Sequence, residues 1–278
     1  MKHRLFITAL CSFAIIATMQ AQHELSFSAF GGNHPLSLSL NDKGTNSGGF
    51  GFGCGVGYNF NFNKTWSIGL GADISFYSAS LKFNPLKDTH TAYDEFEDDD
   101  FTFTATATRF SENVSALLLE VPITARYTLP IGYKNSLRIT GGVKFGLPMN
   151  CSYAASAENL HTKGEFHHLE RQPYENVPGV FVNEPMGKHT GSWNANVSIQ
   201  LTLEAAYRFA MGVKSGLSVG AYLNYGLNNI QNKNDTHPIT FDIYGSNPYS
   251  SNSILNSKFA SSVKPMAIGL RLRFDFGL

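Results

Sequence analysis

The fold is decided by the stretch VKPMAIGLRLRFDFGL, residues Val263 to Leu278. From Met266 onward, a large apolar residue occupies every second position, and the positions between them include Arg271, Arg273 and Asp275. A hydrophobic period of two predicts a β-strand. A strand with one apolar face and one charged face is typical of a transmembrane barrel, in which the apolar face meets lipid and the polar face lines the interior.

Composition does not reveal this class of protein. The chain has 278 residues, of which 15% are charged and 42% hydrophobic, and a soluble domain has similar values. Only alternate residues of a barrel strand face lipid, so a barrel needs no long apolar run. Beyond the N-terminal region no run approaches eighteen apolar residues, which leaves no candidate for a transmembrane helix.

The N-terminal residues MKHRLFITALCSFAIIATMQAQ are typical of a secretory signal peptide. Lys2 and Arg4 precede an apolar region, residues 5–17, and a short polar stretch follows it. The sequence therefore predicts a signal peptide at 1–22 and a barrel domain at 23–278. Removal of the signal leaves 19 basic and 21 acidic residues, a formal charge of 19 − 21 = −2, which argues against a nucleic-acid partner. Cys54 and Cys151 remain, and we expect both to be free thiols.

Eight alternating segments follow, joined by long loops and short turns in alternation. They span residues 24–32, 48–61, 66–80, 114–129, 137–147, 192–210, 216–228 and 263–278. This arrangement predicts an all-β fold, an eight-stranded antiparallel up-and-down transmembrane β-barrel with long extracellular loops, located in the outer membrane. The alternating residues 101–110 are expected to continue as strand above the membrane. The alternative, a secreted soluble β-sandwich, would leave charged residues in its core.

The face expected to point into the barrel carries six basic and four acidic side chains. They are Asp73, Glu120, Arg126, Arg138, Lys144, Glu204, Arg208, Arg271, Arg273 and Asp275. The interior of an eight-stranded barrel is only wide enough to be filled by side chains. We therefore expect a lumenal network of salt bridges, with Glu120 close to Lys144, and no open channel.

The segment LEVPITARY, residues Leu119 to Tyr127, resembles the LEIPLLAKY strand of the outer-membrane β-barrel domain family of Bacteroidota, which includes PorT-like proteins. The general pattern of the mature chain is similar to this family, but only this segment is specific. The resemblance implies a small barrel of the OmpA and OmpX type in the outer membrane. For some members it also implies a part in secretion or surface assembly.

Catalytic and metal motifs are mostly missing. No nucleophile elbow, phosphate loop or paired metal motif occurs, so we expect no enzyme activity, catalytic residue, cofactor or metal. A hydrolase carried by the barrel would place its groups at the outer rim, where His34, Asp42, His90 and His237 fall. The third loop contains further possible metal ligands, namely His161, Glu165, His167, His168, Glu170 and His189. Such a loop is more often simply solvated.

The acidic run at residues 94–100 has two interpretations. Its carboxylates could bind calcium, or the run could be a solvated loop whose charges repel one another. It lacks the glycine and the spacing of an EF-hand loop, which favours the solvated loop.

We expect a monomer with a structural or interaction role carried by its extracellular loops. The expected partners are outer-membrane lipid, the outer-membrane assembly machinery, and envelope or secretion proteins. Two alternatives stay open: a component of a secretion or surface-assembly machine, and a small porin.

Overall fold

A computed structural model describes residues 22–41, 44–95, 98–132, 134–166, 183–212, 214–232, 236–242 and 249–278. The expected signal peptide, except for Gln22, lies outside these residues. The described part is almost entirely β-strand, with one short 3₁₀ helix, η1 (Ile254–Asn256). None of its helical residues forms a segment long and apolar enough to cross a membrane.

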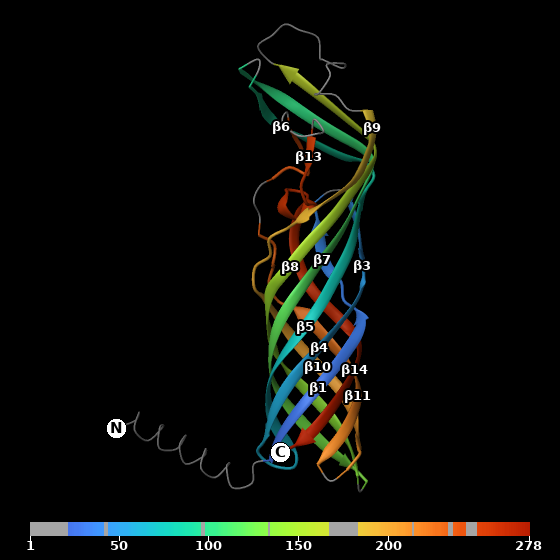
Figure 1. Ribbon diagram of the computed structural model, residues 1–278, viewed down its shortest axis with the longest axis vertical. Coiled ribbons are helices and arrows are strands. Elements are labelled where there is room, and N and C mark those ends of the chain that lie inside the picture. The colour runs from blue at the N-terminus through green and yellow to red at the C-terminus, as the bar shows by residue number, and fades with distance from the viewer. Residues whose placement is uncertain are drawn as a thin grey trace, which may run out of the picture.

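Eight long strands form the body of the molecule. They are β1 (Gln22–Asn33), β4 (Phe50–Asn61), β5 (Trp66–Phe83), β7 (Asp99–Ile131), β8 (Asn135–Phe166), β10 (Ser198–Ala210), β11 (Ser215–Gly226) and β14 (Ala260–Gly277). Six shorter strands are β2 (Leu36–Leu40), β3 (Gly44–Gly48), β6 (Leu86–Asp94), β9 (Asn183–Ser192), β12 (Ile239–Phe241) and β13 (Tyr249–Ser251). Figure 1 shows a tall column with the C-terminus at the bottom and β6, β9 and β13 near the top.

The long strands are all antiparallel to their neighbours. The pairings run β1–β4–β5–β7–β8–β10–β11–β14, and β14 pairs again with β1 from Glu24↔Gly277 to Asn33↔Ile268. The connections at the bottom are short. In the β4–β5 turn, for example, the Asn63 side-chain oxygen accepts hydrogen bonds from the Thr65 and Trp66 amides at 2.8 and 2.7 Å, which is the Asx geometry that favours a tight turn.

Each of the segments predicted as strand overlaps one of these long strands, but several predicted loops are wrong. Residues 36–40 and 44–48 are strands β2 and β3, whereas the sequence indicated a loop. Most of the connection predicted at 148–191 is also strand, because β8 continues to Phe166 and β9 pairs with it. Conversely, the sixth strand begins at Ser198 and not at Ser192. Cys54 and Cys151 are free, Cys54 exposed on β4 and Cys151 buried on β8.

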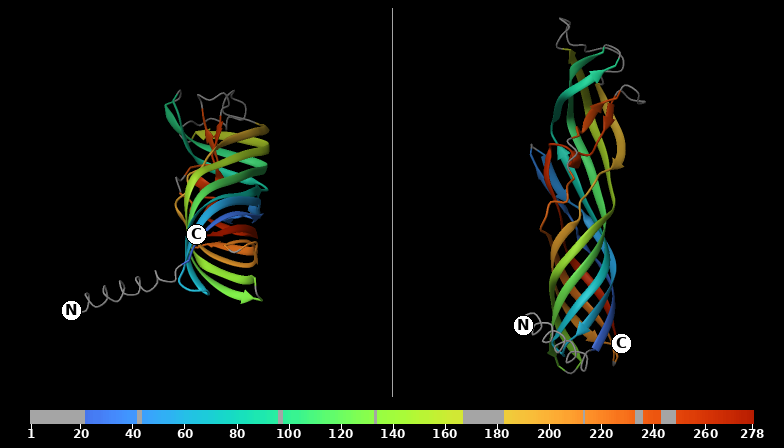
Figure 2. Two further views of the ribbon diagram at one scale, coloured as in Figure 1. Left: turned by 60° about the horizontal axis from the view of Figure 1, so that its bottom comes forward. Right: turned by 90° about the vertical axis from the view of Figure 1, so that its left-hand side faces the viewer.

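The column has two sections that differ in chemistry. The upper section comprises the described residues of 36–48, 81–113, 151–166, 183–196 and 228–263. The lower section comprises the other residues of the long strands. In the right-hand view of Figure 2, the green and yellow strands of the upper section rise above the ring as a continuation of its wall. β6 takes over the pairing with β7 where β5 ends, since Phe83 pairs with Phe110 and Leu86 with Ala107.

In the lower section the outward face is apolar and the inward face is polar. On β10, Leu201 and Leu203 are 46% and 58% exposed, whereas the intervening Thr202 and Glu204 are buried. Exposed large apolar side chains occur on all eight long strands, and apart from Tyr93 all of those found in the described residues belong to the lower section or its rim. The lower section is therefore encircled by an apolar band.

In the upper section the inward face is apolar. Phe101, Phe103 and Phe110 of β7 are buried there, while Arg109 and Ser111 point outward. The last connection, predicted to be a polar loop, folds back into this space. It contributes a set of buried apolar side chains to the core: Ile230, Ile239, Ile254, Leu255 and Phe259. A packed cap therefore fills the top of the column.

Candidate functional site

The inward face of the lower section carries a network of charged side chains, made of two ion-paired groups that follow one another along the interior. The ten charged residues selected from the sequence all belong to it, and Glu24 of β1 is an eleventh member. All of them are buried except Arg208, whose side chain is 19% exposed. The network holds six basic and five acidic groups, so its charges nearly balance.

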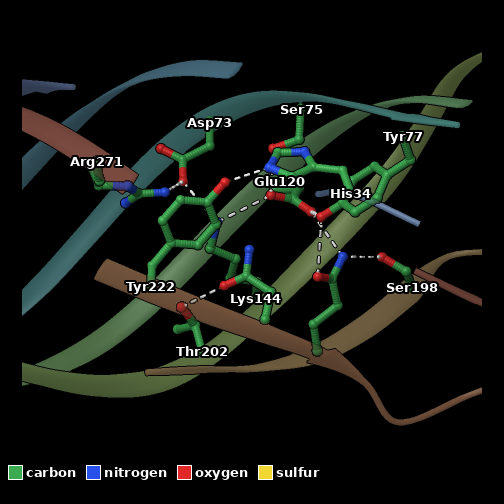
Figure 3. A network of polar contacts seen from close by, with 12 residues as sticks. His34, Asp73, Ser75, Tyr77, Glu120, Lys144, Ser198, Thr202, Tyr222 and Arg271 are labelled. Carbon is green, nitrogen blue, oxygen red and sulfur yellow. Dashed lines mark hydrogen bonds and ion pairs between the residues drawn. The ribbon is translucent and has the colours of Figure 1, made fainter. Parts of the chain in front are cut away.

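The upper end of the network is centred on Glu120 of β7. Lys144 Nζ on β8 lies 3.1 Å from the Glu120 carboxylate and 2.9 Å from that of Asp73 on β5. Glu120 also accepts hydrogen bonds from the Ser75 hydroxyl at 2.7 Å and from the Tyr77 hydroxyl at 2.8 Å. Figure 3 shows Asp73 and Arg271 on one side of Glu120, and Tyr77 and Ser198 on the other. The strand register explains the contact, because Lys144 stands opposite Pro122, two positions from Glu120.

A glycine makes room for Asp73. Gly55 on β4 stands opposite Asp73, and a Cβ atom at that position would lie 1.9 Å from Asp73 Oδ1. Any larger residue would displace the carboxylate that Lys144 contacts. The row of glycines in β4 thus leaves space for long side chains from the opposite wall.

Arg271 links the upper end of the network to its middle. Its Nη2 donates to Asp73 Oδ2 at 3.1 Å, and its Nη1 lies 3.6 Å from Glu204 Oε2. Arg273, two residues further along the same face of β14, donates to Glu204 at 2.8 Å. The alternation of β14 therefore places two guanidinium groups in line along the interior.

The lower end is organised by Glu24 and Asp275. Arg126 donates to Glu24 at 2.6 Å, and Arg138 donates to Glu24 at 2.8 Å and to Asp275 at 2.7 Å. Arg208 Nε lies 3.9 Å from Asp275 Oδ2. Glu24 was missed in the sequence, although the alternation of Glu24, Ser26 and Ser28 with Leu25 and Phe27 contained the signal that it points inward.

Aromatic side chains pack against the upper end of the network. The Arg271 guanidinium lies 4.3 Å from the centre of the Phe30 ring, a distance at which cation–π attraction operates. His34 Nδ1 donates to the Phe76 carbonyl at 3.0 Å, so its Nε2 accepts the hydrogen bond from the Tyr222 hydroxyl. His34 was expected at the outer rim, but it is fully buried inside the column.

The remaining space among these charges is small. A cavity of about 40 Å³ lies beside Arg126, Arg271 and Arg273, which is room for about three water molecules. Several guanidinium nitrogens, including Nε of Arg126 and Nε of Arg271, have no hydrogen-bond partner within the described protein. A space of this size can hold a few water molecules but is too small to form a passage through the lower section.

The other candidates from the sequence are spread over the upper section. His161 and His189 lie on β8 and β9, and His189 pairs with Ala155, six residues from His161, about 20 Å along the strand. Asp42, His167, His168 and Glu170 lie outside the described residues. Of the acidic run, Asp94 ends β6 and Asp99 begins β7, and the Tyr93 hydroxyl donates to Asp98. His90 and His237, by contrast, lie together beside Asp88.

No family model matches the chain, and no curated protein matches it. Among solved structures, the chain is similar to Neisserial surface protein A, with 11% identity, a TM-score of 0.39, and coverage of 93% of this chain and 99% of that one. It is also similar to Ail, the attachment invasion locus protein of Yersinia pestis, in complex with the heparin analogue sucrose octasulfate (12%, TM-score 0.27, 93% and 99%). A third is the translocator domain of autotransporter NalP from Neisseria meningitidis (10%, TM-score 0.24, 99% and 95%). The fold rests on the strand pairings and not on these distant similarities.

Proposed function

We propose that this chain is an integral outer-membrane protein, a closed eight-stranded barrel whose lower section spans the membrane and whose upper section projects from the cell. The observation that carries the proposal is the apolar band around the lower section. Exposed apolar surface that encircles a molecule is incompatible with water. A strand arrangement without free edges is one of the two that can cross a bilayer, because it leaves no backbone group unpaired in lipid.

The height of the band fits a membrane. On β10 and the residue before it, exposed apolar side chains extend from Val197 to Phe209. Twelve steps correspond to about 40 Å along the strand, and to about 28 Å along the membrane normal at a tilt of about 45°. The hydrocarbon core of a bilayer is about 30 Å thick.

The interior supports a non-conducting barrel. The charge network fills the lower section, and the apolar cap closes the upper section. Buried ion pairs are hard to open, because the removal of one partner costs about 3–5 kcal/mol. A porin would need an aqueous path through both layers.

We further propose a non-enzymatic role, in which the upper section acts as a stiff stalk that presents surface to envelope or extracellular partners. β7 has 33 residues, or about 110 Å along the strand, nearly three times the length needed to cross the membrane. Its outward face in the upper section is polar, as expected of a surface in water. A part in secretion or surface assembly, as in PorT-like proteins, would use the same surface.

The membrane topology and the lack of an open channel can be tested with the same protein. In a Cys54→Ala background, Glu158→Cys lies on the exposed outer face of the upper section, and Lys134→Cys lies in the short turn between β7 and β8. A membrane-impermeant maleimide should label the first on intact cells and the second only after permeabilisation. The purified protein in a planar bilayer should give no stable channel. Reversed labelling would mean an inverted topology, and steady conductance steps would favour the small porin.

A further inference from the structure

Three side chains from distant parts of the sequence converge in the upper section. Asp88 and His90 lie two positions apart on the inward face of β6, and His237 precedes β12. One donor atom from each residue lies within 4.8 Å of the other two. We propose that this cluster is a binding site for a first-row transition metal ion of the Zn²⁺ type.

The donor atoms have the spacing that such an ion requires. His237 Nδ1 lies 2.9 Å from Asp88 Oδ2, and His90 Nδ1 lies 3.7 Å from the same oxygen. Ligands of a tetrahedral zinc ion at about 2.0–2.1 Å are about 3.3 Å from one another. The two observed separations lie on either side of that value, so small side-chain rotations bring all three atoms into a common coordination sphere.

One of the three donor atoms makes no hydrogen bond within the described residues. Within the described residues, His90 Nδ1 is buried and has no hydrogen-bond partner, and its distance of 3.7 Å from Asp88 Oδ2 is too long for a hydrogen bond. The two imidazole rings stack with centroids 3.9 Å apart and planes 17° from parallel. This arrangement directs both rings toward one carboxylate, and a metal ion would supply the partner that the nitrogen of His90 lacks.

The surroundings hold the ligands in place. Lys258 Nζ lies 3.0 Å from Asp88 Oδ1, which leaves Oδ2 for the ion and orients the carboxylate, as groups outside the coordination sphere often do. The His237 carbonyl accepts a hydrogen bond from Asn252 at 3.0 Å. The Phe103 ring packs against His90 at 5.3 Å, and the His237 side chain is 30% exposed. The site is therefore supported on one side and open on the other, where a water molecule can take the fourth position.

The donor set selects the class of ion. Two imidazoles and one carboxylate suit zinc and its neighbours, whereas calcium and magnesium prefer oxygen ligands alone. A bound ion would link the segment 236–242, which belongs to the last connection, to β6. The metal ion would thus hold the last connection against β6 and stabilise the packing of the upper section.

The experiment uses the full-length protein in detergent micelles after treatment with a chelator. Titration calorimetry with Zn²⁺ alone should show that His90→Ala and His237→Ala each lose one equivalent of binding, or bind that equivalent at least about tenfold more weakly. Asp88→Asn should do the same, and because the amide oxygen can still accept from His237, this variant keeps the local fold. Co²⁺ should give the intense visible absorption of a tetrahedral site in the unsubstituted protein and not in the three cluster variants.

His189→Ala is the matched control, since His189 lies in the upper section and outside the cluster. This variant should bind Zn²⁺ like the unsubstituted protein. The proposal is overturned if the three cluster variants keep the full stoichiometry and affinity, or if His189→Ala weakens binding as much as they do. The unsubstituted protein failing to bind Zn²⁺ would overturn it as well.

Discussion

Strands β7 and β8 pass through both sections of the column and bury opposite chemistry in each. On the inward face of β7, Phe103 and Phe110 of the upper section give way to Glu120 and Arg126 of the lower section. On the outward face, Asn113 and Ser115 give way to apolar residues such as Ile123. Both faces change within a few residues, which is where the proposed membrane placement puts the boundary between lipid and water.

The comparison shows that the alternation of a strand does not by itself define inside and outside. A period of two sorts residues onto two faces, and the solvent decides which face is the apolar one. In water the apolar face turns inward to form a core. In lipid the apolar face turns outward, and the polar groups of the inward face must pair with one another. The lower section does so with ion pairs, and the upper section packs Phe, Leu and Ile side chains.

The largest effect is expected from loss of the closing strand in the lower section. Deletion of Arg273 to Leu278 removes half of the β14–β1 pairing and two charges of the network. Open strand edges in lipid leave backbone groups unpaired at a cost of several kcal/mol each. The truncated protein should remain in the periplasm and be degraded by added protease in spheroplasts. Normal membrane assembly would contradict the closure of the barrel by β1 and β14.

Loss of one network cation should have the next largest effect. Lys144→Met leaves Glu120 buried without its cation and Asp73 with Arg271 alone. The free energy of unfolding should fall by about 3–5 kcal/mol, as measured by denaturant titration in lipid vesicles. The matched control is Arg109→Met, which breaks the exposed pair with Glu158 on the upper section and should cost less than about 1 kcal/mol. Similar costs for both variants would mean that the lower interior is hydrated.

The alternation of the sequence was enough to place the eight long strands and the inward charges such as Arg271 and Glu204. In the upper section the alternation was interpreted as strand only at residues 101–110, which β7 confirms. The rest was interpreted as loop, because its polar residues face outward and its apolar residues pack on a segment far away in the chain. Ile254 and Leu255, for instance, lie in a stretch rich in Asn and Ser, and only the folded chain brings them against β7. The Asp88 cluster depends on that same connection, since His237 reaches β6 only after the loop has folded back.

A charge placed on the outward face should lower the free energy of unfolding in the lower section much more than in the upper section. Leu203 lies midway along the apolar band of β10, and Leu203→Lys would expose an ammonium group to lipid, at a cost of about 2–4 kcal/mol. Asn113 occupies an exposed outward position of β7 in the upper section, and Asn113→Lys should change the free energy of unfolding by less than about 0.5 kcal/mol. Denaturant titration of both variants in vesicles measures the difference. If Asn113→Lys is as costly as Leu203→Lys, the membrane extends further up the column than the apolar band indicates.

The smallest effect is a pH dependence confined to the upper section. Glu112 of β7 is buried and accepts hydrogen bonds from the Ser253 hydroxyl at 2.5 Å and the Ile254 amide at 2.9 Å. Burial raises the pKa of Glu112 from 4.5 to about 7, although the two donors act to lower it. The folded state therefore holds the proton more tightly than the unfolded chain. The contribution of Glu112 to stability is complete below pH 4.5 and is lost as the pH rises through about 7, by at most about 3 kcal/mol.

The two tryptophans allow this effect to be located, because Trp66 lies in the lower section and Trp193 is buried in the upper one. In a Trp66→Phe background, denaturant titrations followed by Trp193 fluorescence should shift to lower denaturant concentration between pH 5 and pH 8. Glu112→Gln, which keeps the acceptor and removes the titration, should flatten this dependence. In a Trp193→Phe background, Trp66 should report a much smaller shift if the upper section unfolds before the lower one. A pH dependence that persists in Glu112→Gln would assign the effect to another group and leave the last connection held mainly by its apolar contacts.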